Sequence, residues 1–198
     1  MKTHKFFLIT FISVCSIAYG QGTFIYDQQS NTESGTTEGG GNLQSNQPFG
    51  QSFTPTFSSV GFIRLKLYDF DPGNSLGATV YVNLLAISIT GTVLAASSPV
   101  FMPDDFLGYT DFLFLTPVSV TPGTTYYFQP VVQSGDAWIA AWGGSSSYSN
   151  GTAFSNGQAV PFQDLWFREG IVVPEPSPSW LILLGSGIFL YVRRTLHR

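Results

Sequence analysis

The most conspicuous shortage in this sequence is of charge, since only 10% of its 198 residues are Asp, Glu, Lys or Arg. Aromatic residues, by contrast, reach 16%, and Gly, Ser, Thr and Asn are abundant. This composition is typical of an all-β extracellular domain and argues against a cytosolic helical protein. Apolar runs recur along the chain, which excludes disorder over most of it. The length suits one domain with its own core.

Cysteine and histidine are nearly absent, and this excludes several kinds of catalytic and metal site. Cys15 is the single cysteine, and His4 and His197 lie close to the two ends of the chain. Residues 21–171 contain neither cysteine nor histidine and therefore predict no disulfide, no Cys-His pair, no Ser-His-Asp triad and no usual zinc site. Lysine is reduced there to Lys66, a poor candidate for Schiff-base chemistry. We expect no catalytic residue and no enzyme activity.

Positive charge is scarce in the middle of the chain. All 12 acidic residues lie between Asp27 and Glu175, and the basic residues in that stretch are Arg64, Lys66 and Arg168. An acidic body disfavours nucleic acid as a partner, because phosphates need a basic surface. The remaining lysines and arginines stand at the two ends beside apolar runs, a pattern typical of membrane-topology signals.

Residues 1–20 have the three parts of a secretory signal peptide. Lys2 and Lys5 supply positive charge, residues 6–18 form an apolar run, and Ala18-Tyr19-Gly20 places small residues at the −3 and −1 positions. We expect cleavage before Gln21 rather than a short buried helix. An exported chain that lacks cysteine after cleavage indicates a bacterial envelope protein.

The C-terminal end combines a proline-rich stretch, a short apolar run and two arginines. Prolines alternate with other residues in 172–179, which predicts an extended linker. Residues 180–192 carry no charge, and as a helix they would span about 20 Å of a hydrocarbon core about 30 Å thick. Arg193 and Arg194 then form a membrane stop, with residues 193–198 as a basic cytoplasmic tail. We expect a short transmembrane helix rather than a buried core element.

These C-terminal residues resemble the PEP-CTERM sorting signal, in which a Pro174-Glu175-Pro176 motif precedes a short apolar helix and an arginine cluster. The resemblance covers only this end of the chain. It implies recognition by exosortase, a membrane-embedded cysteine protease that cuts near the motif and releases the protein or transfers it to the cell surface. It also implies a Gram-negative bacterium that makes exopolysaccharide, often in a biofilm. The body resembles, more softly, the β-sandwich domains often carried ahead of such signals.

Residues 21–171 predict a single antiparallel β-sandwich, jelly-roll-like, with about eight strands. Alternation with a period of two is clearest where Ile63, Leu65 and Leu67 alternate with basic residues. Asp71–Ser75 and Thr121–Gly123 predict turns, because proline fixes φ while glycine tolerates positive φ. Eight strands are expected near residues 49–55, 60–70, 78–89, 91–98, 109–120, 124–132, 137–142 and 163–172, and residues 23–26 are a candidate first strand. Residues 28–48 read as a long polar loop.

One candidate binding site is a sugar site near residues 134–151. Trp138, Trp142 and Tyr148 offer aromatic faces for sugar rings, and Asp136 is a polar partner. The two tryptophans are four residues apart, so on a regular strand they share a face. That face is either exposed and available to a ligand or turned into the core, and the sequence leaves both alternatives open.

Two further candidates rest on carboxylates. Asp69, Asp71 and Asn74 stand at loop spacing and offer the oxygen ligands that calcium prefers, although the stretch is not an EF-hand and also reads as a plain turn. Asp69/Asp71 and Asp104/Asp105 are the paired carboxylates that a glycosidase would need. Calcium is the only cofactor that the sequence suggests.

The sequence thus predicts an exported, non-enzymatic cell-surface or extracellular-matrix protein associated with exopolysaccharide. Its expected partners are an exosortase, the inner membrane before processing, and exopolysaccharide. One alternative is a carbohydrate-binding module for that exopolysaccharide, and a less favoured one is a glycoside-active enzyme.

Overall fold

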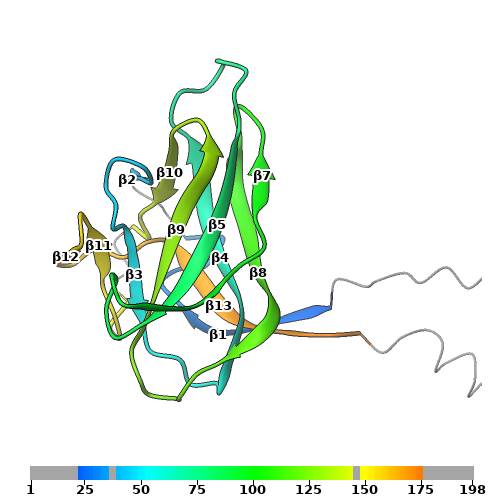
Figure 1. Cartoon of the computed structure of the whole chain (residues 1–198), viewed down its shortest axis with the longest axis vertical. Helices are drawn as coiled ribbons and strands as arrows, with labels where there is room; N and C mark the ends of the chain where they lie inside the picture. The colour runs from blue at the N-terminus through cyan, green and yellow to red at the C-terminus, as the bar shows by residue number, and fades with distance from the viewer. Residues whose placement is uncertain (1–21, 36–38, 145–147, 176–198) are drawn as a thin grey trace, which may run out of the picture. The chain divides into compact units, whose positions relative to one another are not determined.

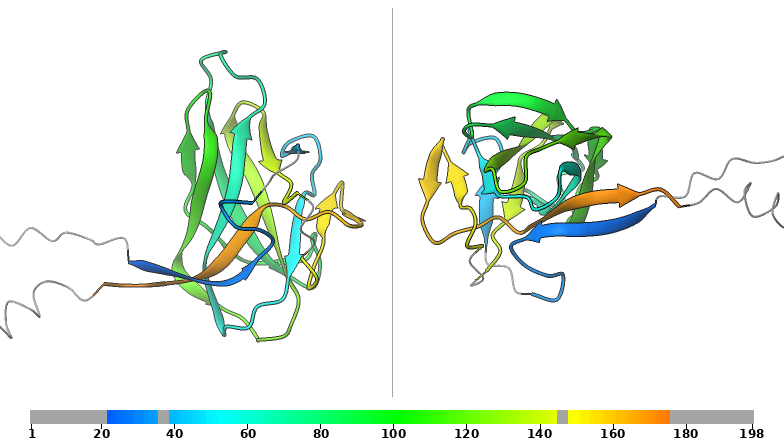
Figure 2. Two further views of the ribbon diagram at one scale, coloured as in Figure 1. Left: turned by 180° about the vertical axis from the view of Figure 1, so that it is seen from behind. Right: turned by 90° about the horizontal axis from the view of Figure 1, so that it is seen from below.

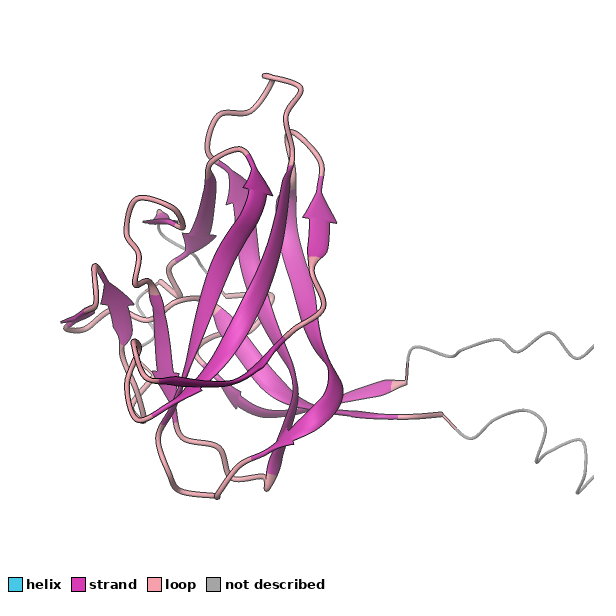
Figure 3. Cartoon of the chain, viewed as in Figure 1, coloured by secondary structure: helices cyan, strands magenta, loops and turns pink. Residues whose placement is uncertain are grey.

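A computed structural model describes residues 22–35, 39–144 and 148–175. All regular elements in this part of the chain are β-strands, joined by loops (Figure 3). The predicted signal peptide and the predicted membrane helix lie outside these residues. Within them, no helix has the length and hydropathy needed to cross a membrane. Residues Thr23–Val173 form one compact unit.

The strands form two antiparallel sheets, as expected for a β-sandwich (Figure 1). The six-stranded sheet contains β1 (Thr23–Gln29), β2 (Gly40–Asn42), β4 (Ser59–Asp69), β8 (Leu107–Ser119), β10 (Trp138–Ala141) and β13 (Phe167–Val173). The seven-stranded sheet contains β3 (Gly50–Phe53), β5 (Ala78–Ala86), β6 (Thr92–Ala96), β7 (Val100–Met102), β9 (Tyr126–Gly135), β11 (Ala153–Ser155) and β12 (Gln158–Val160).

A long strand stands at the centre of each sheet. In the six-stranded sheet β4 pairs with β8 along one edge and with β13 and then β10 along the other. In the seven-stranded sheet β5 pairs with β9 along one edge and with β6 and β7 along the other. Strands β1 and β2 extend the first sheet, and β3, β11 and β12 extend the second.

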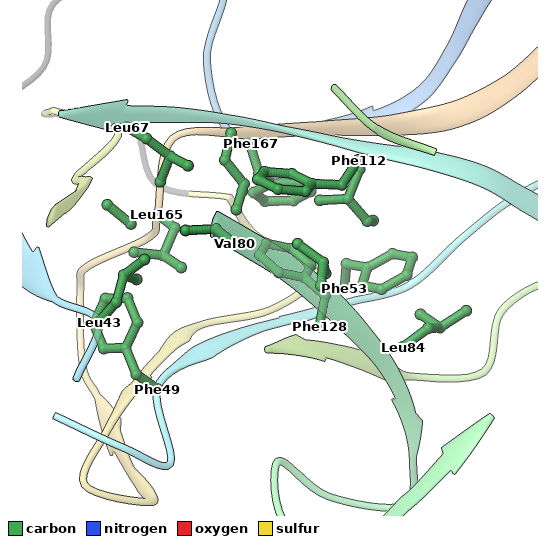
Figure 4. Packing of buried hydrophobic residues seen from close by; sticks show 14 of the residues in the cluster. Leu43, Phe49, Phe53, Leu67, Val80, Leu84, Phe112, Phe128, Leu165 and Phe167 are labelled. Atoms are coloured by element: carbon green, nitrogen blue, oxygen red, sulfur yellow. The ribbon is translucent and has the colours of Figure 1, made fainter. Parts of the chain in front are cut away.

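The core lies between the two sheets and is rich in phenylalanine (Figure 4). Ile63, Leu65 and Leu67 of β4 are fully buried, as the alternation predicts. On β8 the same pleat buries Phe112 and Phe114 and leaves their neighbours exposed. Fully buried rings come from both sheets and from the loops between them: Phe49, Phe53, Phe112, Phe128 and Phe167.

The described residues form thirteen strands, where the sequence predicted about eight. Most of the difference comes from four strands of three residues each, namely β2, β7, β11 and β12. Three residues are too few to show an alternating pattern, so these strands are defined by their partners. Strand β2 lies within the stretch predicted as a long polar loop, and β13 continues to Val173, beyond the predicted domain boundary at residue 171.

Both predicted turns occur. Gly73 adopts a φ of 88° in the loop between β4 and β5, and Gly123 adopts a φ of 77° between β8 and β9. In the second turn the Thr124 N–H donates to the Thr121 carbonyl at 3.1 Å. A left-handed backbone of this kind is the reason that glycine is favoured at both positions.

Candidate functional site

The predicted sugar site does not present its tryptophans to solvent. Trp138 is fully buried, and its ring lies 5.9 Å from that of Phe106. Trp142 is partly buried and packs on Phe49, with ring centroids 5.8 Å apart. The two tryptophans do share a face, but that face is turned to the core. The alternative in which they stack on a sugar is therefore wrong for Trp138, whose ring has no exposed surface.

The other two residues of that predicted site, Tyr148 and Asp136, form hydrogen bonds that stabilise the surrounding loops. The Tyr148 hydroxyl accepts from the Thr54 N–H at 3.2 Å and donates to Gln28 Oε1 at 2.9 Å. Burial raises the pKa of Tyr148 to about 12. Asp136 Oδ1 accepts from the Ala137 N–H at 2.7 Å, and its Oδ2 accepts from the Asn74 amide. These contacts order the local chain.

The predicted calcium ligands also bond to their own loops. Asp69 Oδ1 accepts from the Asp71 N–H at 2.9 Å, and its Oδ2 accepts from the Asp105 N–H at 3.1 Å. Asn74 Oδ1 accepts from the Leu76 N–H at 2.7 Å. In the described part of the chain no three His, Cys, Asp or Glu side chains come together as a group able to hold a metal ion. The geometry is that of a carboxylate-stabilised loop.

Of the second carboxylate pair, Asp104 serves the same loops. Its Oδ1 accepts from the Gly73 N–H at 2.9 Å, and its Oδ2 accepts from the Ser75 N–H at 2.6 Å. Desolvation alone would raise the pKa of Asp104, but these hydrogen bonds outweigh it and lower the pKa. A general acid in a glycosidase needs a raised pKa, so Asp104 is shifted in the opposite direction.

The predicted sorting motif begins directly after the last strand described. Pro174 and Glu175 are exposed and follow β13 without an intervening loop. Pro176, Arg193 and Arg194 lie outside the described residues. Strands β1 and β13 are side by side, and Thr23 pairs with Val173 in their register (Figure 2). The two ends of the sandwich therefore lie at the same end of one two-stranded ribbon.

A surface that the sequence did not predict lies on the outside of the six-stranded sheet. We call it the cationic face. It is formed by Arg64 and Lys66 of β4, Arg168 of β13, Tyr26 of β1 and Tyr109 of β8. Arg64 and Arg168 are paired directly opposite one another in the β4–β13 register. The signal in the sequence was the alternation of basic with apolar residues in β4, but only strand pairing adds the other members.

Arg64 is the best-anchored cation of this face. Its guanidinium makes a bidentate contact with Asp111, with Nε–Oδ1 and Nη2–Oδ2 distances of 2.6 and 2.8 Å. Its Nη1 donates to the Tyr26 hydroxyl at 2.8 Å and to Glu33 at 2.6 Å. The hydrogen bonds to Asp111 raise the pKa of Arg64 further above its usual range. Glu33 also lies 3.6 Å from Arg168, so it bridges two cations that would otherwise repel each other.

A shallow pocket of about 290 Å³ lies beside these cations on the outer side of the sheet. Its lining residues are Gly39, Lys66, Tyr68, Leu107 and Ala141. Lys66 therefore belongs both to the cationic face and to the pocket wall. Leu107 is 68% exposed and adds an apolar rim to the pocket.

Neither the protein-family models nor the curated proteins gave a match to this sequence.

A second feature missed by the sequence analysis is a buried carboxyl at one end of the core. Glu169 of β13 is fully buried, and neither of its carboxyl oxygens reaches hydrogen-bonding geometry with a partner. Burial, with a smaller contribution from the neighbouring Asp27 carboxylate, raises the pKa of Glu169 to about 9. The side chain is therefore protonated at neutral pH. From the sequence, a glutamate near the end of a strand would be expected to be exposed and charged. Nothing in the local sequence indicates that Glu169 is buried.

Asp27 next to it is held as an anion. The Thr56 and Phe57 N–H groups donate to its Oδ2 at 2.7 and 2.8 Å. Desolvation alone would raise the pKa of Asp27, but hydrogen bonds led by that of the Thr56 side chain lower it. Asp27 is the extra residue of a bulge in β1, because the register skips from Tyr26 to Gln28. The bulge thus turns a carboxylate toward the loop before β4.

Proposed function

We propose that this protein is an exported, non-enzymatic component of the cell surface or extracellular matrix, sorted and cleaved by an exosortase at its C-terminal signal. In this proposal its body is a jelly-roll-like sandwich, the inner membrane holds it before processing, and exopolysaccharide surrounds it afterwards. The observation that carries the proposal is the Thr23–Val173 pair at the end of the β1–β13 ribbon. Removal of a signal peptide before Gln21 and of a sorting signal after Pro174 would leave every strand intact.

The position of the Pro174-Glu175-Pro176 motif supports the proposal that the chain folds first and is cut by the exosortase afterwards. An intramembrane or membrane-associated protease needs an extended, accessible backbone, and Pro174 and Glu175 are exposed residues outside the last strand. The hydrogen-bonded register of β13 ends at Val173, so cutting beyond it breaks no ladder bond. Folding and processing can therefore proceed independently.

Intact-mass analysis of the protein recovered from its native host tests the proposal. We expect an N-terminus at Gln21 and a C-terminus near Pro174–Ser177. A chain that ends at Arg198 would show that the tail is a permanent anchor and would overturn the sorting proposal.

A matched pair of variants sharpens this experiment. Glu175→Ala alters the motif and is expected to leave the unprocessed mass, whereas Asp71→Ala, another exposed acidic residue, is expected to be processed normally. Processing of both variants alike would show that the motif is not what the protease reads.

The second candidate function is that of a carbohydrate-binding module. The observation that favours it is the pocket lined by Lys66, Tyr68 and Leu107, where a sugar ring would meet a half-buried tyrosine and an exposed leucine. A glycan array probed with residues 21–175 tests this function, because these residues include the whole compact unit and its core. Absence of any glycan signal would remove it. The third alternative, a glycoside-active enzyme, gains no support from Asp104.

A further inference from the structure

Charge is distributed unequally between the two sheets. Arg64, Lys66 and Arg168 are the only lysines and arginines in residues 22–175, and all three are on β4 and β13 of the six-stranded sheet. The strands of the seven-stranded sheet contain no charged residue of either sign. A protein with twelve acidic residues has thus gathered the positive charge of its body on one outer face.

Each cation of that face lies against an aromatic ring. The Arg168 guanidinium carbon is 3.9 Å from the centroid of the Tyr26 ring, and that of Arg64 is 5.8 Å from the same ring. The Lys66 ammonium is 5.8 Å from the centroid of the Tyr109 ring. These distances are those of cation–π contacts, in which the ring face attracts and helps to position the cation.

Arg64 and Lys66 differ in what surrounds their charged groups. Arg64 is held by Asp111 and Glu33, so it fixes the sheet surface and its negative partners offset its charge. Lys66 lies in the wall of the pocket together with Tyr68 and the exposed side chain of Leu107. A ligand in this pocket would meet one ammonium group and an apolar wall.

We propose that this pocket binds a carboxylated sugar unit of an acidic polysaccharide, with the Lys66 ammonium facing the carboxylate and Tyr68 and Leu107 against the ring. A uronate combines the two properties that the pocket can recognise, because its ring has apolar C–H faces and its carboxylate is an anion. A neutral sugar would offer no negative charge to the ammonium. This inference rests on the carbohydrate-binding function proposed above and is independent of C-terminal sorting.

Binding to three polymers tests the inference with residues 21–175 of the protein. Polygalacturonate supplies the carboxylated ring, dextran supplies a neutral ring, and polyadenylate supplies an anionic polymer without carboxylates. We expect polygalacturonate to bind, dextran and polyadenylate to bind at least about tenfold more weakly, and added salt to weaken the polygalacturonate complex.

Two variants locate the site, and a third serves as the control. Lys66→Gln is expected to weaken polygalacturonate binding at least about tenfold, and Tyr68→Ala is expected to weaken it as well. Tyr81→Ala removes a half-buried tyrosine of β5, on the uncharged sheet, and is expected to bind as the parent does. Circular dichroism and thermal unfolding confirm that each variant is folded.

The outcomes separate the inference from the function on which it rests. Equal binding of dextran and polygalacturonate, or an unchanged Lys66→Gln variant, would overturn the inference and leave carbohydrate binding standing. Preference for polyadenylate would overturn it in favour of a general anion site. Failure of the parent protein to bind either polysaccharide would overturn both, while the masses of the processed protein would still decide the sorting proposal.

Discussion

Replacing Glu169 by glutamine is expected to stabilise the protein at neutral pH and to change how its stability depends on pH. The native side chain is fully buried without a hydrogen-bond partner, and its pKa is raised from the ordinary 4.5 to about 9. In the unfolded chain the same carboxyl ionises freely. Folding therefore requires that a proton be taken up by this residue at every pH between these two values.

The sign and the size of the effect on stability follow from the interval between the two pKa values of Glu169. Because the native state binds more protons than the unfolded state, stability is fully present below about pH 4.5 and is lost as the pH rises toward 9. Each pH unit in the interval costs about 1.4 kcal/mol. The cost is thus on the order of 3 kcal/mol at pH 7 and about 6 kcal/mol above pH 9. A glutamine is neutral at all these pH values, so the contribution of residue 169 to the pH dependence of stability disappears.

Urea unfolding at pH 5, 6, 7 and 8 measures the free energy of unfolding of both proteins. The parent is expected to lose about 1.4 kcal/mol per pH unit relative to Glu169→Gln. The difference between pH values is the diagnostic quantity, because the buried amide adds a constant cost of its own. Glu175→Gln makes the same chemical change at an exposed site after β13 and should run parallel to the parent.

Parallel pH profiles for the parent and Glu169→Gln would refute the reasoning, since they would show that Glu169 does not titrate between these pH values. The reasoning would also be refuted if the free energy of unfolding of the parent, relative to Glu169→Gln, decreased as the pH was lowered. That result would mean that the native Glu169 carboxylate is ionised and has a depressed pKa. Retention of the profile in Asp27→Asn would show that burial, the main cause of the shift, acts without the neighbouring carboxylate.

Two further predictions concern packing. Phe112→Ala should lower the free energy of unfolding by about 3 to 5 kcal/mol, whereas Leu115→Ala, on the same strand but 94% exposed, should change it by less than about 0.5 kcal/mol; equal losses in urea unfolding would show that the β8 pleat is assigned to the wrong faces. Gly50→Ala would place a Cβ 2.0 Å from the Phe128 carbonyl oxygen, whereas the nearest atom at Gly61 is 3.2 Å away. The melting temperature should therefore drop clearly for Gly50→Ala and less for Gly61→Ala, and the reverse order would contradict the close approach of β3 to β9.

The strands that could be predicted are those whose pattern is long enough to read. Alternation over β4 predicts both the strand and its buried face, because successive side chains in a strand point to opposite sides. The three-residue strands β2, β7, β11 and β12 were not predicted, since each is defined by its hydrogen bonds to a partner strand and not by a pattern of its own. Trp138 shows the same limit for the site. Its shared face with Trp142 follows from spacing, but whether that face meets the core depends on the opposite sheet.

The sequence by itself determined the all-β class, the two turn glycines, the acidic body and the signals expected at both ends, because each is encoded in composition or in residues that are close in the chain. Only the tertiary structure decided which polar residues are buried and which meet. Arg64 and Arg168 became neighbours through the pairing of β4 with β13, and Glu169 became a buried acid through the packing of the two sheets. Burial and charge contact are properties of the surroundings, and here the surroundings come from strands far apart in the sequence.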